Sequence, residues 1–273
     1  MTTDVLSRNN VRILGNETGP VVIFGHGFGC DQAMWRRIVP QFTDEYRVVV
    51  FDHVGSGESD KSAYTPAKYS SLDGYVSDLL DICRELDLQD ATFVGHSVSA
   101  MMAVIAAASA PQHFSNMVLL ASSPSYMDHP LDGYTGGFTP ADIDDLLTSL
   151  DTNYIVWATE MAPVIMGNPE KPELQDELAG SFCQLDPAIA RDFARVSFRS
   201  DVRALLPEVK VPTLILQCSD DLLAPTHIGT YTQERIPGST LVQLKATGHL
   251  PHVSAPIETA EAILSYLARV PAA

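Results

Sequence analysis

Ser97 is the residue of this sequence whose surroundings most clearly indicate chemistry. It lies in the segment Gly95–Ser99, after an apolar, β-forming stretch and before a helix-forming run at 98–110. A serine on a sharp turn from strand to helix presents its hydroxyl outward as a nucleophile. Glycine is expected at position 95, because no side chain fits beneath such a turn. The pattern therefore predicts a serine nucleophile, and hence an enzyme.

The motif alone does not decide the matter. The usual pattern has glycine two residues after the nucleophile, and this chain has Ser99 there. A second Gly-x-Ser occurs at Gly57-Glu58-Ser59, but the residues that follow it open no helix. The context therefore favours Ser97 over Ser59, and the alternative for Ser97 is a buried or capping serine.

A serine hydroxyl needs a base to accept its proton, and histidine is the usual one. His249 follows the last expected strand on a glycine-containing loop. This places it at the carboxyl edge of the sheet, where Ser97 also lies and where open α/β sheets bind ligands. His252 is the competing candidate, and we expect it to pack near the start of the last helix instead.

The base needs a carboxylate to hold its tautomer. Asp220 and Asp221 follow an expected strand at 213–217 and precede His249. The chain order Ser, Asp, His is that of the α/β-hydrolases. We expect Asp221 to orient His249, and Asp220 to be a solvated turn or capping residue.

The glycine-rich run after the first buried strand, residues 24–29, predicts an oxyanion hole. Its expected donors are the backbone amides of Phe28 and Val98. His26 is expected to brace this loop rather than to react. The glycine spacing is not that of a dinucleotide site, since Cys30 stands where a third glycine would fall. We therefore expect no cofactor.

Strand and helix patterns alternate in the first half of the chain. Buried strands are expected at 21–24, 48–51, 91–94 and 117–121, and helices at 35–42 and 71–86. Strands at 213–217 and 240–244 and a helix at 257–267 follow later. Such alternation predicts an α/β fold with a mostly parallel sheet flanked by helices.

The alternation is interrupted after Pro124. From residue 141 to about 206 the pattern is helical throughout, with four segments punctuated by prolines, of which Pro172 and Pro187 suit first helical turns. A helical insertion of this kind is typical of a lid over an active site. We therefore expect an α/β core formed by 1–124 and 207–273, and a helical lid, or cap, formed by 125–206.

Composition excludes several classes of function. The 273 residues carry a net charge of −17, which argues against nucleic acid as a partner. The four scattered cysteines fit neither a zinc site nor a disulfide framework. We also expect no metal at Asp142, Asp144 and Asp145, which suit the start of a helix. The absence of a long apolar run and of a signal-peptide pattern at residues 1–4 predicts a cytoplasmic protein with no membrane partner.

The sequence resembles the α/β-hydrolase superfamily, and closely its RsbQ-like branch of bacterial stress regulators, to which the plant strigolactone and karrikin receptors are more distantly related. The matching stretches extend over nearly the whole chain: residues 27–32, 51–57, 94–98, 153–158, 216–221 and 248–252. The resemblance implies an α/β-hydrolase fold with a four-helix lid. It also implies a triad of Ser97, Asp221 and His249.

The resemblance further implies a mostly apolar pocket for a small hydrophobic ligand, for which Phe28, Trp157 and Phe198 are the candidates. For Trp157, packing within the helical core is the alternative. Ser99 departs from the pattern of the α/β-hydrolases at large. Its added side chain should overpack the nucleophile helix unless a neighbour is small, and we expect it to be tolerated and to tune the packing.

Two functions remain open. The first is a serine hydrolase of carboxylesterase or lactonase type, which forms an acyl-enzyme on a small hydrophobic ester or lactone. The second is a stress-signalling regulator or receptor, which binds or slowly hydrolyses such a ligand to switch a protein partner. Both functions need the same triad, so the sequence does not separate them.

Overall fold

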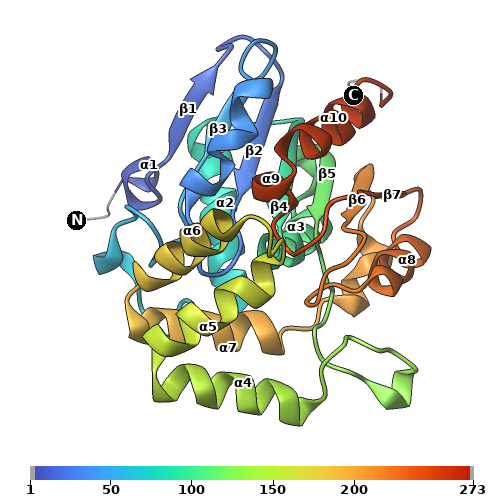
Figure 1. Cartoon of the computed structure of the whole chain (residues 1–273). Helices are drawn as coiled ribbons and strands as arrows, with labels where there is room; N and C mark the ends of the chain where they lie inside the picture. Colours follow the sequence, from blue (N-terminus) through green and yellow to red (C-terminus); the bar gives the residue numbers. More distant parts are fainter. Residues whose placement is uncertain (1–3, 271–273) are drawn as a thin grey trace.

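The computed structural model describes residues 4–270 and is built around a sheet of seven strands within that range (Figure 1). The strand order is β1-β3-β2-β4-β5-β6-β7, with β1 antiparallel to β3 and the other neighbours parallel. The strands are β1 (Arg12–Gly15), β2 (Val21–Gly25), β3 (Arg47–Val50), β4 (Ala91–His96), β5 (Phe114–Leu120), β6 (Thr213–Gln217) and β7 (Thr240–Gln243).

The order of the strands determines where a ligand can bind. From β2 the chain passes to β3 on one side and then to β4 on the other, so the strand order reverses there. Parallel sheets bind ligands at the carboxyl ends of strands beside such a reversal. The loops that follow β2 and β4 contain Phe28 and Ser97.

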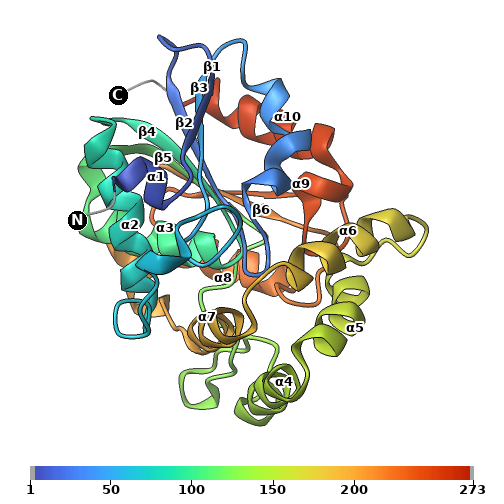
Figure 2. The same ribbon diagram turned by 90° about the vertical axis from the view of Figure 1, so that its left-hand side faces the viewer.

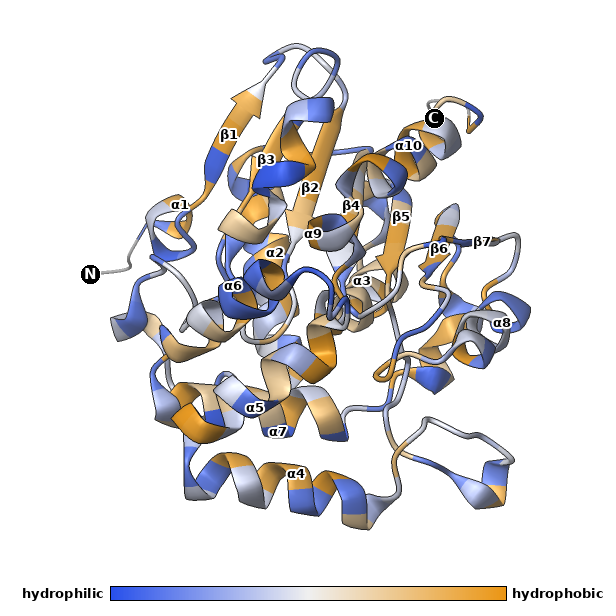
Figure 3. Ribbon diagram, viewed as in Figure 1, coloured by the Kyte–Doolittle hydropathy of each residue, from blue (hydrophilic) through white to orange (hydrophobic). Residues whose placement is uncertain are grey.

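Helices cover both faces of the sheet, because successive strand residues point to opposite sides. On β4, Phe93 joins the core beneath α2 (Leu72–Glu85) and α3 (Val98–Ser109). Its neighbour Val94 joins the core beneath α10 (Pro256–Leu267). Figure 2 shows α2 and α3 on one side of the sheet and α9 (Pro251–Ser254) and α10 on the other. Figure 3 shows the central strands as mainly hydrophobic. This confirms the predicted three-layer α/β fold.

Four α-helices lie between β5 and β6 and gather at one end of the molecule (Figure 1). They are α4 (Pro140–Thr152), α5 (Tyr154–Met166), α6 (Pro172–Cys183) and α7 (Pro187–Arg199). Side chains of Thr139, Asn153 and Asp186 cap three of them, and proline occupies the first turn of α6 and α7 as predicted. We call these four helices the cap helices; the exact division of the chain at 125 and 206 stays a prediction.

Side-chain contacts tie the cap helices to the core. Arg37 pairs with Glu177 of α6 through two hydrogen bonds of 3.0 and 2.6 Å. Ser181 of α6 donates to the carbonyl of Gly29 at 2.7 Å, and this carbonyl belongs to the loop after β2. The loop that is expected to hold an oxyanion is therefore fixed from the cap side.

Some elements differ from the sequence prediction. The expected helix at 35–42 is a pair of 3₁₀ helices, η1 (Gln32–Arg37) and η2 (Val39–Gln41), since Pro40 cannot donate a helical hydrogen bond. Strand β1 and helix α8 (Thr226–Arg235) were not predicted, because β1 is fully exposed and α8 has a mostly polar sequence. The remaining short elements are α1 (Val5–Arg8), η3 (Lys61–Ala63), η4 (Pro111–His113), η5 (Pro130–Asp132), η6 (Arg203–Glu208) and α9 (Pro251–Ser254).

Within residues 4–270, no helix is long and apolar enough to cross a bilayer. The cytoplasmic location stays a prediction. Residues 1–3, on which the expectation of no signal peptide partly depends, lie outside the described residues.

Candidate active site

Ser97 lies on a strained turn between β4 and α3. Its backbone has φ 56° and ψ −119°, a conformation that residues other than glycine rarely adopt. Gly95 allows the start of α3 to approach the strand, because a Cβ at this position would lie 2.5 Å from the carbonyl oxygen of Ser99. The structure therefore has the strand–turn–helix arrangement that the sequence predicts here, and strain of this kind is typical of functional sites.

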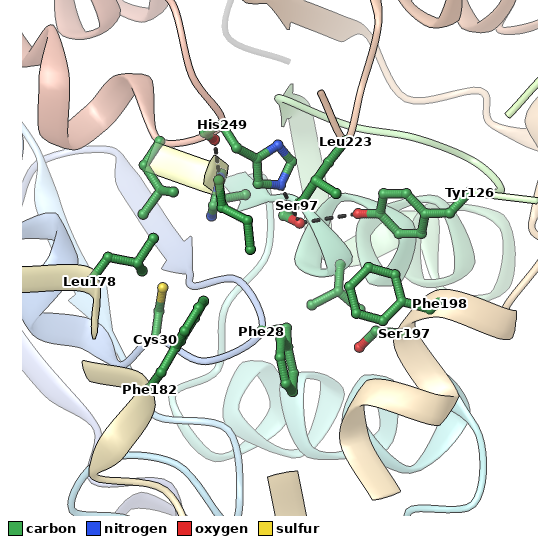
Figure 4. Close-up of a pocket in the computed structure, with 14 residues that line it drawn as sticks. Phe28, Cys30, Ser97, Tyr126, Leu178, Phe182, Ser197, Phe198, Leu223 and His249 are labelled. Carbon is green, nitrogen blue, oxygen red and sulfur yellow. Dashed lines mark hydrogen bonds between the residues drawn. The ribbon is translucent and has the colours of Figure 1, made fainter. Parts of the chain in front are cut away.

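Ser97, His249 and Asp221 form a continuous chain of hydrogen bonds. The Ser97 Oγ lies 2.8 Å from His249 Nε2. Figure 4 marks this hydrogen bond with a dashed line. The other ring nitrogen, Nδ1, lies 2.8 and 3.1 Å from the two carboxylate oxygens of Asp221. Since a carboxylate accepts, Nδ1 carries the proton, and Nε2 is left free to accept the proton of the serine. All three side chains are buried.

Backbone hydrogen bonds position the other two members of the triad, Asp221 and His249. Asp221 Oδ1 accepts hydrogen bonds from the amides of Leu223 and Ala224 at 2.9 and 3.2 Å. The amide of His249 donates to the carbonyl of Ile165 at the end of α5, 2.9 Å away. The neighbouring Asp220 side chain is exposed. The structure thus brings Asp221, and not Asp220, to the histidine, as expected.

His252 packs in the core, as expected. Its ring lies 4.3 Å from that of Trp35, and neither of its nitrogens has a partner among the described residues. Burial disfavours the charged ring and lowers the pKa of His252 to about 3. His252 is therefore neutral, and it is His249, not His252, that is hydrogen-bonded to Ser97.

His96, next to the nucleophile, contacts both sides of the site, which the sequence reasoning missed. Its Nε2 donates to the carbonyl of His249 at 2.8 Å. A Cβ on Gly27 would lie 2.6 Å from its Nδ1, so the ring presses against the loop after β2. Burial lowers the pKa of His96 well below its usual value, and the neutral ring braces both loops.

The amides expected to form the oxyanion hole are available. Among the hydrogen bonds of residues 4–270, neither the amide of Phe28 nor that of Val98 donates to another group. Both residues line the same cavity as Ser97. His26 braces the loop as expected: its Nδ1 donates to the carbonyl of Gly27 at 2.9 Å, and its Nε2 accepts from the amide of His53 at 3.1 Å.

Ser99 is accommodated because its neighbour across the helix–strand contact is Gly25. A Cβ at Gly25 would lie 3.1 Å from the Ser99 Oγ, so the facing strand supplies the small residue that the sequence analysis required. The Ser99 hydroxyl donates to the carbonyl of His26 at 2.5 Å and lies 2.8 Å from His53 Nε2. Ser99 therefore joins the nucleophile helix to the loop after β2.

A cavity opens beside Ser97 between the core and the cap helices (Figure 4). Phe28 and Phe198 line it, as expected. Trp157 is not among the residues that line this cavity, so its place in the substrate pocket stays a prediction. Its ring is buried and packs against Phe28 and Phe182, at ring-centre distances of 6.1 and 5.5 Å. These contacts are compatible with the alternative for Trp157, packing within the helical core.

Tyr126 is a further member of the site that the sequence reasoning missed. Its hydroxyl lies 3.1 Å from the Ser97 Oγ (Figure 4). Because the serine proton points to His249, the tyrosine is the donor in this contact. Burial raises the pKa of Tyr126, so its hydroxyl stays protonated. No sequence motif marks it, since it lies in the loop after β5.

Comparison with known proteins identifies the family. Residues 22–262 match the model described as the alpha/beta hydrolase family. Since this match spans most of the chain, the protein belongs to the α/β hydrolase family. The match confirms the predicted fold and class of enzyme.

Relatives match over most of their length. The chain is 37% identical over 249 residues, 91% of each chain, to the probable esterase D14L of Oryza sativa subsp. japonica. It is equally identical, with the same coverage, to the karrikin insensitive 2 receptor CA of Petunia hybrida. It is 36% identical to the strigolactone esterase D14 of Arabidopsis thaliana, over 97% of this chain and 98% of that protein. These matches confirm the predicted relation to the plant receptors.

A solved structure is also similar. The fold superposes on olei00960, a hydrolase from Oleispira antarctica, with a TM-score of 0.94 and 40% identity over 97% of each chain. The agreement covers the cap helices as well as the sheet, since it extends over nearly the whole chain.

Proposed function

We propose that this protein is a serine hydrolase of carboxylesterase or lactonase type, which acts on a small hydrophobic ester or lactone. Ser97 is the nucleophile, His249 the general base and acid, and Asp221 the carboxylate that orients it. The observation that carries the proposal is the Ser97 Oγ at 2.8 Å from His249 Nε2, with Asp221 bound to the other ring nitrogen, at the wall of a largely apolar cavity.

In the first half of the reaction, Ser97 attacks the ester carbonyl while its proton passes to His249 Nε2. The amides of Phe28 and Val98 donate to the oxyanion of the tetrahedral intermediate. When the intermediate collapses, the bond to the alcohol breaks, and His249 gives that alcohol its proton. The acyl group is then attached to Ser97.

In the second half, a water molecule takes the place of the alcohol. His249 accepts a proton from this water as it attacks the acyl-enzyme, and the same two amides stabilise the new oxyanion. Collapse of the intermediate returns the proton to Ser97 Oγ and releases the acid. A lactone follows the same steps, except that the alcohol and the acid belong to one molecule.

The core and the cap would have different roles in this reaction. The core, residues 1–124 and 207–273, carries the triad and the oxyanion amides. The cap, residues 125–206, supplies apolar wall residues such as Phe182 and Phe198, which would exclude water from the reacting bond. Similarity to an esterase also supports the proposal, because the strigolactone esterase D14 of Arabidopsis thaliana matches almost the entire chain.

Steady-state hydrolysis of p-nitrophenyl esters with acyl chains of two to eight carbons tests this proposal. We expect turnover by the wild type, with an optimum at short or medium chains, and its loss in Ser97→Ala. Ser59→Ala is the matched control, since Ser59 belongs to the other Gly-x-Ser sequence and its hydroxyl, among the described residues, bonds within its own loop. Full activity in a folded Ser97→Ala variant would overturn the assignment.

A second candidate function is a receptor that binds or slowly hydrolyses its ligand to switch a protein partner. The observation that favours it is the 37% identity, over 91% of each chain, to the karrikin insensitive 2 receptor CA of Petunia hybrida. Capture of partners from lysate by wild type and Ser97→Ala, each with and without ligand, tests it. A partner retained only with ligand supports the receptor; fast turnover with no ligand-dependent partner supports the hydrolase alone.

A further inference from the structure

Ser197 carries a hydroxyl that the proposed mechanism does not use. It lies on α7, its side chain lines the cavity beside Ser97, and it is only 2% exposed. Figure 4 shows it in the wall next to Phe198, across from Phe28. Its Oγ has no hydrogen-bond partner among the described residues. Buried hydroxyls are nearly always paired, so this atom needs an explanation.

The helix itself could have satisfied this hydroxyl. Serines within helices commonly donate to the carbonyl four residues earlier. Ser200, one turn further along, does so, with its Oγ 2.6 Å from the carbonyl of Val196. Ser197 makes no such bond, although the residue lines the cavity, and its Oγ is buried without a partner among the described residues.

The hydroxyls of Ser97 and Tyr126 also lie in the cavity wall, and both already have hydrogen-bond partners. The Ser97 Oγ is hydrogen-bonded to Tyr126 and to His249 at the reacting end. Ser197 lies outside this network, in a wall formed by aromatic side chains such as Phe28 and Phe198. It is therefore a hydroxyl of the wall that can meet a ligand away from the bond that breaks.

We propose that the Ser197 hydroxyl binds a second oxygen of the substrate, such as a carbonyl or ether oxygen, remote from the reacting carbonyl. The substrate class is then a small ester or lactone that bears an additional hydrogen-bond acceptor, rather than a plain hydrocarbon ester. This inference rests on the proposed hydrolase function and specifies its substrate.

The physical basis is the asymmetry of buried hydrogen bonds. A plain hydrocarbon substrate leaves the Ser197 hydroxyl, which is already buried, without a partner. A substrate oxygen in the right place accepts a hydrogen bond from it, and this hydrogen bond strengthens binding. Sites with a buried polar group therefore discriminate strongly against analogues that lack the matching group. Since the contact is remote from the reacting atoms, it should affect KM more than kcat.

Two pairs of esters, each pair differing by one CH₂-to-oxygen exchange, test the inference. In the acyl part the pair is p-nitrophenyl pentanoate and p-nitrophenyl 3-methoxypropanoate. In the alcohol part it is butyl acetate and 2-methoxyethyl acetate, followed by pH-stat titration. For each pair, the ratio of kcat/KM for the oxygen-containing ester to that for the hydrocarbon ester is compared between wild type and Ser197→Ala. Intrinsic ester reactivity cancels in this comparison.

We expect Ser197→Ala to lower that ratio about 3- to 10-fold in at least one pair, mainly through KM, as for the loss of one hydrogen bond. Hydrolysis of the hydrocarbon esters should be maintained or improved, which also shows that the variant is folded. Ser200→Ala is the matched control and should keep the wild-type ratios, since the Ser200 hydroxyl is held by Val196.

The outcomes separate this inference from the proposed function. Unchanged ratios in both pairs, with hydrolysis that still depends on Ser97, overturn the role of Ser197 and leave the hydrolase in place. No Ser97-dependent hydrolysis of any of the four esters overturns both.

Discussion

The His53 imidazole and the Ser99 hydroxyl are hydrogen-bonded at 2.8 Å, and together they join the nucleophile helix to the loop after β2. Because Ser99 donates to the carbonyl of His26, His53 Nε2 must be the donor to Ser99. Burial lowers the pKa of His53 well below its usual value, which fits a neutral ring with a single proton on Nε2. The residue that departs from the common motif therefore has a structural partner of its own.

This relationship predicts the effect of restoring glycine at position 99. Ser99→Gly removes a fully buried hydroxyl, and the carbonyl of His26 loses the hydrogen bond that this hydroxyl donates. We expect a loss of about 1–2 kcal/mol in the free energy of unfolding and no gain in kcat. Urea denaturation and ester hydrolysis measure the two effects. A large increase in kcat would show instead that the serine obstructs the site.

Asp221 and Asp220 offer a matched pair of substitutions. Asp221→Asn should lower kcat by about 10³- to 10⁴-fold, because the amide no longer holds the proton on His249 Nδ1 and the tautomer needed by Ser97 is lost. Asp220→Asn should stay within about twofold of wild type, since its side chain is exposed. Equal losses in the two variants would contradict the assignment of Asp221. Circular dichroism checks that both variants are folded.

Much of the site could be predicted because its chemistry depends on local sequence. The turn at Ser97 is fixed by Gly95 and the start of α3, and the order of the parallel strands brings the loops with Phe28, Asp221 and His249 to one edge. These features follow from neighbours in the chain and from the topology of a parallel sheet. The sheet itself was predicted for the same reason, since its buried strands are apolar runs.

The side chains that depend on packing could not be predicted in this way. Tyr126 and Ser197 reach the cavity only because α7 and the loop after β5 fold over Ser97. Trp157 belongs to a stretch that resembles the family, and its ring packs against that of Phe28, a contact that sequence spacing does not show. Strand β1 was missed because an exposed edge strand carries no burial pattern.

The lowered pKa of His252 should make the free energy of unfolding depend on pH in acid. Its folded pKa of about 3 lies below the value near 6.5 of an unfolded histidine. Below pH 6.5 the unfolded chain therefore binds a proton that the folded protein does not, so stability falls as the pH drops from about 6.5 towards 3. His252→Phe preserves the ring contact with Trp35 and removes two unpaired nitrogens.

We therefore expect His252→Phe to weaken this pH dependence by up to about 1.4 kcal/mol per pH unit below pH 6. Urea denaturation of both proteins at pH 7.5, 6 and 5 measures it. If the difference in unfolding free energy between variant and wild type is the same at all three pH values, His252 does not stay neutral in the folded protein.

We expect the Tyr126 hydroxyl to assist deacylation more than acylation. In deacylation the Ser97 Oγ is the leaving atom and gains negative charge, and the Tyr126 hydroxyl, 3.1 Å away, can donate to it. Tyr126→Phe should lower kcat about 3- to 10-fold, as for one hydrogen bond, and should slow deacylation more than acylation. Stopped-flow hydrolysis of p-nitrophenyl acetate would then show a larger burst of p-nitrophenol than in the wild type. A reduced kcat without a burst would instead place the effect of Tyr126 on acylation, where its donation to Oγ would have to orient the serine towards His249.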